Sequence, residues 1–291
     1  MKHETEQLLS TLEVLNSQTF LWETDTQGEF NPWNLIISEG FVNLTDVERA
    51  FEHWQNIEQW GTPTNQEDHD YAPPRGERKD ETWNEEIATQ RQSYYQQLRQ
   101  FLHTYLQNIQ AYNLSVPISE RQDFEWEYPD FSISIVVGEM RDRNWLCIAP
   151  TVPNQVNIYR HNRGQYKTSS SDNTELQIIL DNLNPITIYG YYDGGYKYTY
   201  QHQIVCATSS TKAYAIEQAL RAAQMLLVSN PDRDRGEYNN PKLYQFLTSS
   251  LQDFNFYLFS FWDIGYIYEV GQAASEDWLG VRSTIEFEYN P

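Results

Sequence analysis

Cysteine is scarce in this sequence. Two cysteines, Cys147 and Cys206, occur among 291 residues, and they form neither a C-x-x-C pair nor a regular framework. Such usage argues against a disulfide-stapled scaffold and favours a reduced, cytoplasmic setting. Both cysteines lie inside apolar stretches, so we interpret them as packing residues rather than as reactive nucleophiles, which need an accessible electropositive site.

Basic residues are also few. Lys and Arg total 20 against 41 Asp and Glu, which gives a formal charge of −21 and a pI of about 4.5. Such a surface repels a phosphate backbone, so we expect no direct nucleic-acid binding, whereas a basic protein would be attracted. Residues 1–154 hold 26 acids against 10 bases, notably in WETDTQGEF, in residues 61–81 and in RQDFEWEYPD. These acids either solvate loops or form a negative face for a partner.

Long apolar runs and common catalytic motifs are absent from the sequence. No run of 18 apolar residues occurs, and MKHETEQLLSTLEVL has no apolar signal core, so we expect no membrane association. G-x-S-x-G, P-loop, dinucleotide and H-E-x-x-H motifs are missing, and the six histidines are scattered. We interpret His53 and His103 as structural, and Asp232 and Asp234 as too few ligands for calcium. The sequence therefore predicts no metal, no cofactor and no enzymatic activity.

The sequence does contain an internal similarity. FSISIVVGEMRDRNWLCIAP and IGYIYEVGQAASEDWLGVRST align at an offset of 133 residues, which matches Gly138 with Gly271 and Trp145 with Trp278. Each tryptophan restarts an apolar stretch after a polar turn. A wide aromatic ring at such a position is expected to cover the core. Trp145 and Trp278 are therefore predicted to be equivalent core residues.

A second pair of blocks lies upstream, in the same order. Residues 101–112 and 246–257 share the pattern F-L-x3-L-Q-x4-Y at an offset of 145. Repeated blocks in one order indicate a duplicated unit. We therefore predict two related domains, residues 1–154 and 170–291. The polar, Ser-rich stretch around HNRGQYKTSSSDN predicts a linker, placed at 155–169.

Hydrophobic periodicity predicts helices interleaved with strands. Helices are expected at 4–15, from a cap at Asn43 or Thr45 to about 55, and at 83–108, 174–183, 212–228 and 241–252. Strands are expected at TFLWE, WNLIIS, 110–116, 131–138, 145–152, 186–192, 197–208, 254–262, 264–271 and 278–287. This order is typical of an α+β layered sandwich with helices covering an antiparallel sheet. The tyrosine-rich hairpin YGYYDGGYKYTYQHQ is either an interaction patch or β-compatible filler.

The first half contains, in this order, the stretches FLWETDTQGEFNPWNLII, NLTDVERAFEHW, QRQSYYQQLRQFLHTYLQNIQAYNL and ISIVVGEMRDRNWLCIAPTV. Over about residues 5–153 these stretches resemble the nuclease A inhibitor family, the inhibitors of sugar-non-specific nucleases. The resemblance implies a three-layer α-β-α sandwich, so we expect two tandem α-β-α layered sandwich domains. It also implies an activity: binding a nuclease and blocking its active site with an acidic side chain that reaches the metal region.

The resemblance places that acidic side chain at Asp25, in WETDTQ, where the family pattern has the longer Glu. A carboxylate suits the role because hard cations prefer oxygen ligands. We predict Glu23, Asp25 and Glu29 as partner-binding residues, with a protein partner such as a basic nuclease. The second half keeps only Asp193 in the matching segment and is either a scaffold or a site for another partner.

Two other functions stay open at this point. The chain could be a scaffold that keeps only the fold and binds an unknown partner, or an enzyme that uses clustered carboxylates. Paired acids perform acid-base chemistry only if burial separates their pKa values. Exposure of Asp25 would favour a binding role, and enclosure of Asp25 beside Glu23 in a cleft would favour catalysis.

Overall fold

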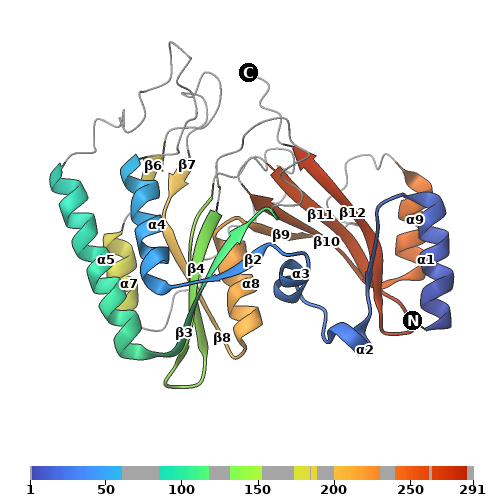
Figure 1. Ribbon diagram of the computed structural model, residues 1–291, viewed down its shortest axis with the longest axis horizontal. Coiled ribbons are helices and arrows are strands. Elements are labelled where there is room, and N and C mark those ends of the chain that lie inside the picture. Colours follow the sequence, from blue (N-terminus) through green and yellow to red (C-terminus); the bar gives the residue numbers. More distant parts are fainter. Residues whose placement is uncertain are drawn as a thin grey trace, which may run out of the picture. The chain divides into compact units, whose positions relative to one another are not determined.

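The protein has a mixed α+β fold in the computed structural model, as the sequence predicts at this level (Figure 1). The structure describes residues 2–60, 85–117, 132–152, 174–183, 185–188, 200–229, 240–261 and 264–286. These residues form two five-stranded antiparallel sheets, a two-stranded sheet and eight helices. None of the helices in these ranges is long and apolar enough to cross a membrane.

The elements have the following bounds. The helices are α1 (His3–Leu15), α2 (Thr24–Gln27), α3 (Pro32–Ser38), α4 (Val47–Trp60), α5 (Glu85–Tyr105), α7 (Thr174–Asn182), α8 (Lys212–Ala222) and α9 (Pro241–Ser250). The strands are β1 (Thr19–Trp22), β2 (Val42–Thr45), β3 (Leu106–Ser115), β4 (Ser132–Met140), β5 (Trp145–Pro150), β6 (Ile186–Ile188), β7 (Tyr200–His202), β8 (Ile204–Ser209), β9 (Leu226–Ser229), β10 (Gln252–Phe261), β11 (Ile264–Gln272) and β12 (Trp278–Glu286).

The chain divides into two compact units that differ from the expected domains. Of the described residues, unit 1 contains those within Met1–Leu35 and Met225–Glu288, and unit 2 those within Ile36–Asn154 and Gln165–Gln224. The expected division into 1–154, 155–169 and 170–291 follows the order of the sequence. The observed division instead follows strand pairing, because β1 pairs with β12 and β8 pairs with β5.

Unit 1 is built on sheet A, with the strand order β1-β12-β11-β10-β9. One face carries α1 and α9, whose leucines form a common core with β12. The core contains Leu12, Leu243, Leu247, Leu251, Ala273, Leu279 and Val281. Helix α9 begins where its sequence predicts, because Pro241 follows Asn240 and the Asn240 side chain accepts a hydrogen bond from the Leu243 backbone amide at 3.1 Å.

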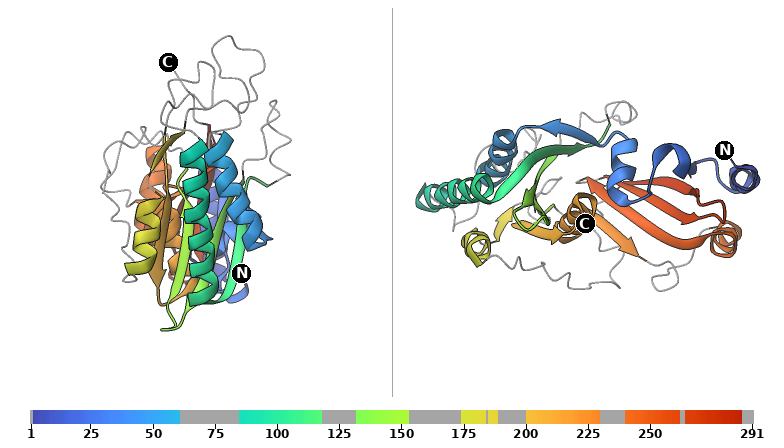
Figure 2. Two further views of the ribbon diagram at one scale, coloured as in Figure 1. Left: turned by 90° about the vertical axis from the view of Figure 1, so that its left-hand side faces the viewer. Right: turned by 90° about the horizontal axis from the view of Figure 1, so that it is seen from below.

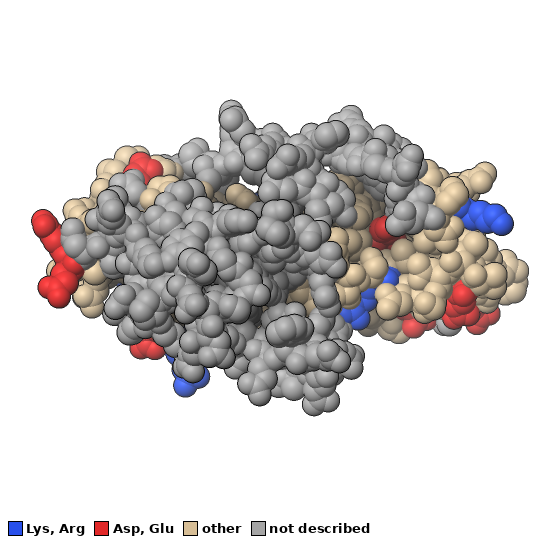
Figure 3. Space-filling view, turned by 90° about the horizontal axis from the view of Figure 1, so that it is seen from above, with Lys and Arg blue, Asp and Glu red and all other residues tan. Residues whose placement is uncertain are grey.

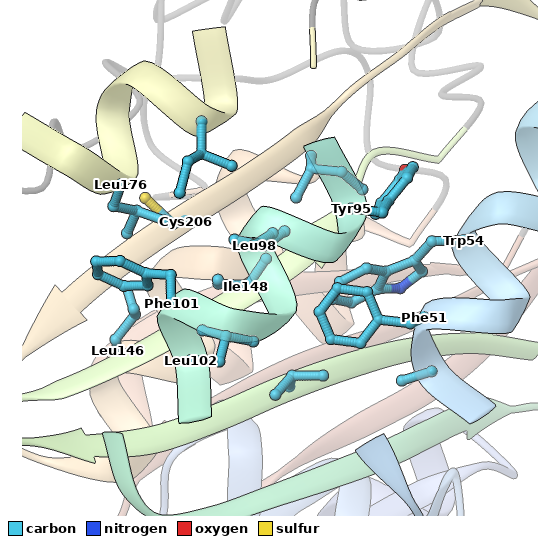
Figure 4. Close-up of a cluster of buried hydrophobic side chains, with 14 of the residues drawn as sticks. Phe51, Trp54, Tyr95, Leu98, Phe101, Leu102, Leu146, Ile148, Leu176 and Cys206 are labelled. Carbon is cyan, nitrogen blue, oxygen red and sulfur yellow. The ribbon is translucent and has the colours of Figure 1, made fainter. Parts of the chain in front are cut away.

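Unit 2 is built on sheet B, with the strand order β2-β3-β4-β5-β8. Helices α4, α5 and α7 supply apolar side chains to one face, with Phe51 and Trp54 from α4 and Leu98 from α5 in the cluster of Figure 4. Strand residues Leu146 and Ile148 join this cluster. Helix α8 lies on the opposite side of the sheet, against β5 and β8 (Figure 2). Helices therefore cover both faces of sheet B.

One expected strand and one expected helix cap in the first half are wrong. WNLIIS forms helix α3 rather than a strand, because Pro32 opens the helix and the Asn31 side chain accepts a hydrogen bond from the Asn34 amide at 2.8 Å. The cap of α4 is Asp46, whose carboxylate accepts the Arg49 amide at 2.8 Å. The expected caps, Asn43 and Thr45, lie in strand β2 instead.

In the second half, the helix expected at 212–228 ends at Ala222. The apolar residues that follow form β9, which pairs with β10 from Leu226 to Ser229. Cross-strand packing thus overrides a helical pattern at this point. Several sequence predictions lie outside the described residues: the acidic segments 61–81 and RQDFEWEYPD, the pair Asp232 and Asp234, the proposed linker, Asp193 and most of the tyrosine-rich hairpin.

Candidate functional site

The predicted acidic residues lie at one corner of unit 1, on and beside helix α2. Strand β1 ends at Trp22, Glu23 occupies the N-cap position of α2, and Asp25 lies in its first turn. The Asp25 side chain is 71% exposed. Glu29 follows α2 and is also exposed, whereas Glu23 is half-buried. The three acids therefore lie in or beside one short helix. The chain then leads to helix α3 and not to a second strand.

Helix α2 is fixed to the turn between β11 and β12. The Thr24 backbone amide donates to Asp277 Oδ1 at 3.1 Å, and the Thr24 hydroxyl donates to the Glu276 carbonyl at 2.7 Å. The Trp22 indole donates to the Gly28 carbonyl at 2.9 Å. Gly28 has a φ of 79°, a conformation that glycine adopts without strain. These bonds hold both ends of α2. The turn between β11 and β12 therefore fixes the orientation of the exposed face of this helix.

Asp277 is the centre of this corner. Its side chain is 2% exposed, and besides the Thr24 amide it accepts a hydrogen bond from the Thr5 hydroxyl at 2.6 Å. The Lys2 ammonium lies 3.9 Å from Asp277 Oδ1. A buried carboxylate is costly unless it is hydrogen-bonded and paired with a cation, and Asp277 has both kinds of partner. The carboxylate thereby ties the start of α1 and the start of α2 to one turn.

Lys2 also reaches Asp25. Its ammonium lies 3.3 Å from Asp25 Oδ2 and donates a hydrogen bond to the Ser275 carbonyl at 2.6 Å. Figure 1 shows helix α2 near the N-terminal end of the chain. The Asp25 carboxylate is therefore accessible and already beside one cation. An incoming cationic group would compete with Lys2 for it.

Trp145 and Trp278 are not the core residues that the sequence predicts. Trp278 is half-buried and stacks on Phe30, with ring centroids 4.4 Å apart and an angle of 22° between the planes. Trp145 is also half-buried and lies 6.0 Å from the Lys212 ammonium. The next residue in each strand points the other way and is fully buried: Leu146 and Leu279 have 0% exposure.

Trp278→Ala should lower the free energy of unfolding by about 2 kcal/mol, because a half-buried ring and one stacked pair are lost. Phe30 would lose its stacking partner beside α2, while Leu279 would stay in place. Urea denaturation followed by circular dichroism measures the effect. A loss near 5 kcal/mol, the upper end of the range for deleting a fully buried aromatic ring, would contradict the half-buried position of Trp278.

A second group of polar side chains is buried inside unit 2. Arg91 donates two hydrogen bonds to Glu58, from Nε to Oε2 and from Nη2 to Oε1, each 2.7 Å long. The Tyr95 hydroxyl donates to Glu58 Oε1 at 2.5 Å, and His202 Nε2 lies 3.9 Å from the same oxygen. Burial, followed by the charge of Glu58, holds the pKa of Tyr95 well above its usual range, so Tyr95 stays a donor. Burial alone would lower the pKa of Arg91, but Glu58 outweighs it and raises that pKa.

This buried group was not predicted from the sequence. Glu58 and Arg91 are 2% and 5% exposed, and His202 is 0% exposed, so the group joins α4, α5 and β7 beneath the surface. A signal was present: Arg91 precedes Tyr95, Leu98 and Leu102 by four, seven and eleven residues, and so lies on their buried face of α5. A charged residue in an apolar stripe indicates a buried partner. The low exposure makes a structural role the direct interpretation.

The other chemically capable residues are isolated from one another. His53 is half-buried against the Ser134 hydroxyl at 3.1 Å, and burial lowers its pKa. His103 is exposed, 3.9 Å from Glu48. Cys147 is buried, and burial raises the pKa of its thiol, which opposes nucleophile chemistry. Within the described ranges, no cluster of three or more His, Cys, Asp or Glu side chains is arranged to hold a metal ion.

Comparison with known proteins adds no identification. The sequence matches no protein-family model, no curated protein and no solved structure. The resemblance to nuclease inhibitors therefore stays a prediction that depends on the quoted segments, and the candidate site depends on the geometry around Asp25.

Proposed function

We propose that the chain is a protein-binding module that presents Asp25, with Glu23 and Glu29, to a basic protein. The family resemblance names the partner to test first, a sugar-non-specific nuclease whose active site the acidic corner would block. One observation carries the proposal: the Asp25 side chain is 71% exposed on a helix whose backbone is bonded to the buried Asp277. An accessible carboxylate on a fixed support suits recognition of a cationic pocket.

Rigidity supports this proposal. Binding costs free energy when loops and side chains must be ordered, and a segment that is already ordered avoids part of that cost. Helix α2 is held by the Thr24 bonds at its start and by the bond from Trp22 to Gly28 after its end. Glu23 adds a further local bond, because its amide donates to the Gln27 side chain at 2.8 Å.

Charge supports the proposal less directly. The net charge of −21 would attract a basic partner at long range and repel nucleic acid. Figure 3 shows exposed Asp and Glu side chains among the described residues of one face. Long-range attraction would bring a basic partner toward the protein, and the local geometry at Asp25 would supply the selection of a site.

For the fold, we propose that both units are α-β-α layered sandwiches, as the resemblance implies, and that the chain derives from a duplicated domain, as the repeated sequence blocks indicate. In unit 1, α1 and α9 cover one face of sheet A. In unit 2, helices lie on both faces of sheet B. The free, buried cysteines Cys147 and Cys206 fit a reducing compartment, so the proposal includes a cytoplasmic location.

Asp25→Ala should weaken binding of the purified protein to a sugar-non-specific nuclease by roughly 30-fold or more, the effect expected for one desolvated charge contact. Binding should also weaken for the unchanged protein as salt rises from low to moderate concentration, because long-range attraction is screened. Titration calorimetry at two salt concentrations measures both effects, and a nuclease activity assay reports inhibition.

Glu13→Ala is the matched control, since Glu13 is an exposed acid on α1 and its loss changes the net charge equally. If both variants bind alike, Asp25 has no specific role. If the unchanged protein binds no such nuclease at either salt concentration, the nuclease assignment fails. The chain would then be a scaffold or interaction protein for a different partner.

A further inference from the structure

The two sheets have the same strand order, and each takes its fifth strand from the other half of the sequence. In sheet B, β2-β3-β4-β5 are followed by β8, and in sheet A, β9-β10-β11-β12 are followed by β1. Both fifth strands are antiparallel to their neighbour and pair at the same place, since Leu146 lies opposite Thr208 and Leu279 lies opposite Leu21. The strands thus have the same spatial order in both sheets. In the sequence, however, the fifth strand precedes the other four in sheet A and follows them in sheet B.

The helices that precede these fifth strands follow the same exchange. Helix α1 leads into β1 and packs its Leu12 with leucines of α9 on sheet A. Helix α7 precedes β8, with the two-stranded sheet of β6 and β7 between them, and packs Leu176 and Ile179 into the core of sheet B with α5. In each case a helix and a strand from one half of the sequence complete a sheet formed by the other half.

The two sheets that receive these segments share an irregularity at equivalent positions. Strand β3 shifts register against β4 between Gln107 and Gln110, and β10 shifts against β11 between Gln252 and Asn255. Each shift contains a non-glycine residue with positive φ: 50° at Asn108 and 47° at Asp253. These positions differ by 145 residues, the offset of the upstream sequence blocks. Such bulges are specific structural features rather than random defects.

The hairpin turns correspond as well, at the other offset of 133 residues. Arg143 and Glu276 have φ values of 69° and 72°. The Arg143 amide donates to the Met140 carbonyl at 2.9 Å, and the Glu276 amide donates to the Ala273 carbonyl at 2.9 Å. The bulge and the hairpin turn therefore lie at equivalent positions in the two units.

The shared glycine has the same packing in both places. A Cβ atom on Gly138 would lie 2.9 Å from the Leu106 side chain, and one on Gly271 would lie 2.8 Å from the Leu251 side chain. Leu106 and Leu251 are themselves 145 residues apart. The leucine at the first position of β3 and the leucine directly before β10 thus pack on a glycine of the next strand, which explains the glycine that both hairpins share.

From these correspondences we infer that the chain consists of two equivalent halves that have exchanged their N-terminal helix–strand segments. The segment from α1 to β1 completes the sheet of the second half, and the segment from α7 to β8 completes the sheet of the first half. Each half therefore needs the other to close its sheet. The fold corresponds to a segment-exchanged dimer in which both copies lie on one chain.

The inference also concerns the acidic corner, but it does not depend on what binds there. Thr24 and Asp25 come from the first half, whereas Glu276 and Asp277 come from the second half. The support of Asp25 is therefore assembled only when the exchange is in place. A chain with one such half would leave the β12 edge open, and the segment that fits this edge is α1–β1 of a second copy.

A disulfide tests the contact between the halves in the full-length chain. The hydroxyl oxygens of Thr5 and Ser275 lie 2.9 Å apart, so Thr5→Cys with Ser275→Cys should oxidise to a cross-link. Peptide mass mapping without reductant should then recover residues 5 and 275 in one linked fragment. Ser10→Cys with Ser275→Cys is the control. Ser10 is exposed and lies more than one helical turn after Thr5 on α1, so this pair should form no intramolecular link. Equal linkage in both pairs, or none in the first, overturns the inference.

Cutting the folded chain tests the mutual dependence. A protease site is placed between residues 161 and 173, and the purified full-length protein is cut there. The halves should co-elute as one species and should stay together in urea until both sheets have unfolded, because each sheet contains strands from both fragments. Two folded fragments that separate, without denaturant or at a first urea transition, would show that each half closes its own sheet and would overturn the inference.

Discussion

Arg91→Met should lower the free energy of unfolding by about 3–5 kcal/mol, because it removes the guanidinium that pairs with the buried Glu58 carboxylate. The Glu58 side chain is 3% exposed and accepts both Arg91 hydrogen bonds at 2.7 Å. The neutral Tyr95 hydroxyl also donates to Glu58, but a hydroxyl does not replace a guanidinium. Unit 2 should lose stability first, since α4 and α5 meet at this pair.

Arg99→Met provides the matched control on the same helix. Arg99 pairs with Glu48 at 3.0 Å, but the two side chains are 34% and 54% exposed. Pairs of this kind contribute about 0–1 kcal/mol, because water and salt screen them. Urea denaturation of both variants at one pH measures the difference. Similar losses for Arg91→Met and Arg99→Met would show that burial does not decide the strength of the Glu58 pair.

Replacing both charged residues tests how much of the stability lost in Arg91→Met comes from the buried Glu58 charge. Glu58→Leu with Arg91→Met removes the carboxylate together with the guanidinium, and apolar replacements of buried ion pairs are often neutral or stabilising. Here Tyr95 would lose the acceptor of its 2.5 Å bond, so part of the loss should remain. The double variant should therefore be more stable than Arg91→Met alone, which a simple sum of two damaging changes would not give.

Helices and strands of the fold were predictable where one local pattern dominates. The leucines of α1 recur at helical spacing, so the predicted helix at 4–15 is observed at His3–Leu15. The meander at the end of the chain alternates apolar residues with short turns, and its three strands are observed near their predicted bounds. The α+β class follows from these elements. Each depends on neighbours within a few residues, which a sequence displays directly.

Pairing between distant segments was not predictable in this way. Strand β1 has four residues and pairs with β12, which starts at Trp278. Nothing in TFLW selects that edge over the nearer β2, because backbone hydrogen bonds are the same for every partner. The choice depends on the fit of α1 and α9 on sheet A. For the same reason, the expected boundary at residue 154 differs from the division that strand pairing produces.

The candidate site shows the same contrast. The resemblance placed the candidate residue at Asp25 and left its exposure open, and the structure shows the side chain 71% exposed. Its neighbours Lys2 and Asp277 were not predicted, since they come from opposite ends of the sequence. Arg91 was missed for a different reason: it interrupts an apolar stripe, and only a partner on another helix explains its burial. Chemistry that depends on tertiary contacts needs the fold first.

Trp54→Ala should lower the free energy of unfolding by about 3–5 kcal/mol, the range for deleting a fully buried aromatic ring. Trp54 has 0% exposure, and its ring centroid lies 5.0 Å from that of Phe51 in the core of unit 2 (Figure 4). Its indole also donates to the Ser134 carbonyl at 2.7 Å, which joins α4 to β4. The substitution removes both the ring and this bond.

Trp54→Phe distinguishes the two contributions, because it keeps an aromatic ring and removes the indole donor. A buried carbonyl that loses its side-chain donor costs about 1–3 kcal/mol, so this variant should be less damaging than Trp54→Ala. Circular dichroism in urea is the suitable measurement, since nine tryptophans make fluorescence report on several sites at once. A loss for Trp54→Ala no larger than that for Trp278→Ala would contradict the difference in burial between the two rings. It would also place the main core of unit 2 somewhere other than between α4, α5 and sheet B.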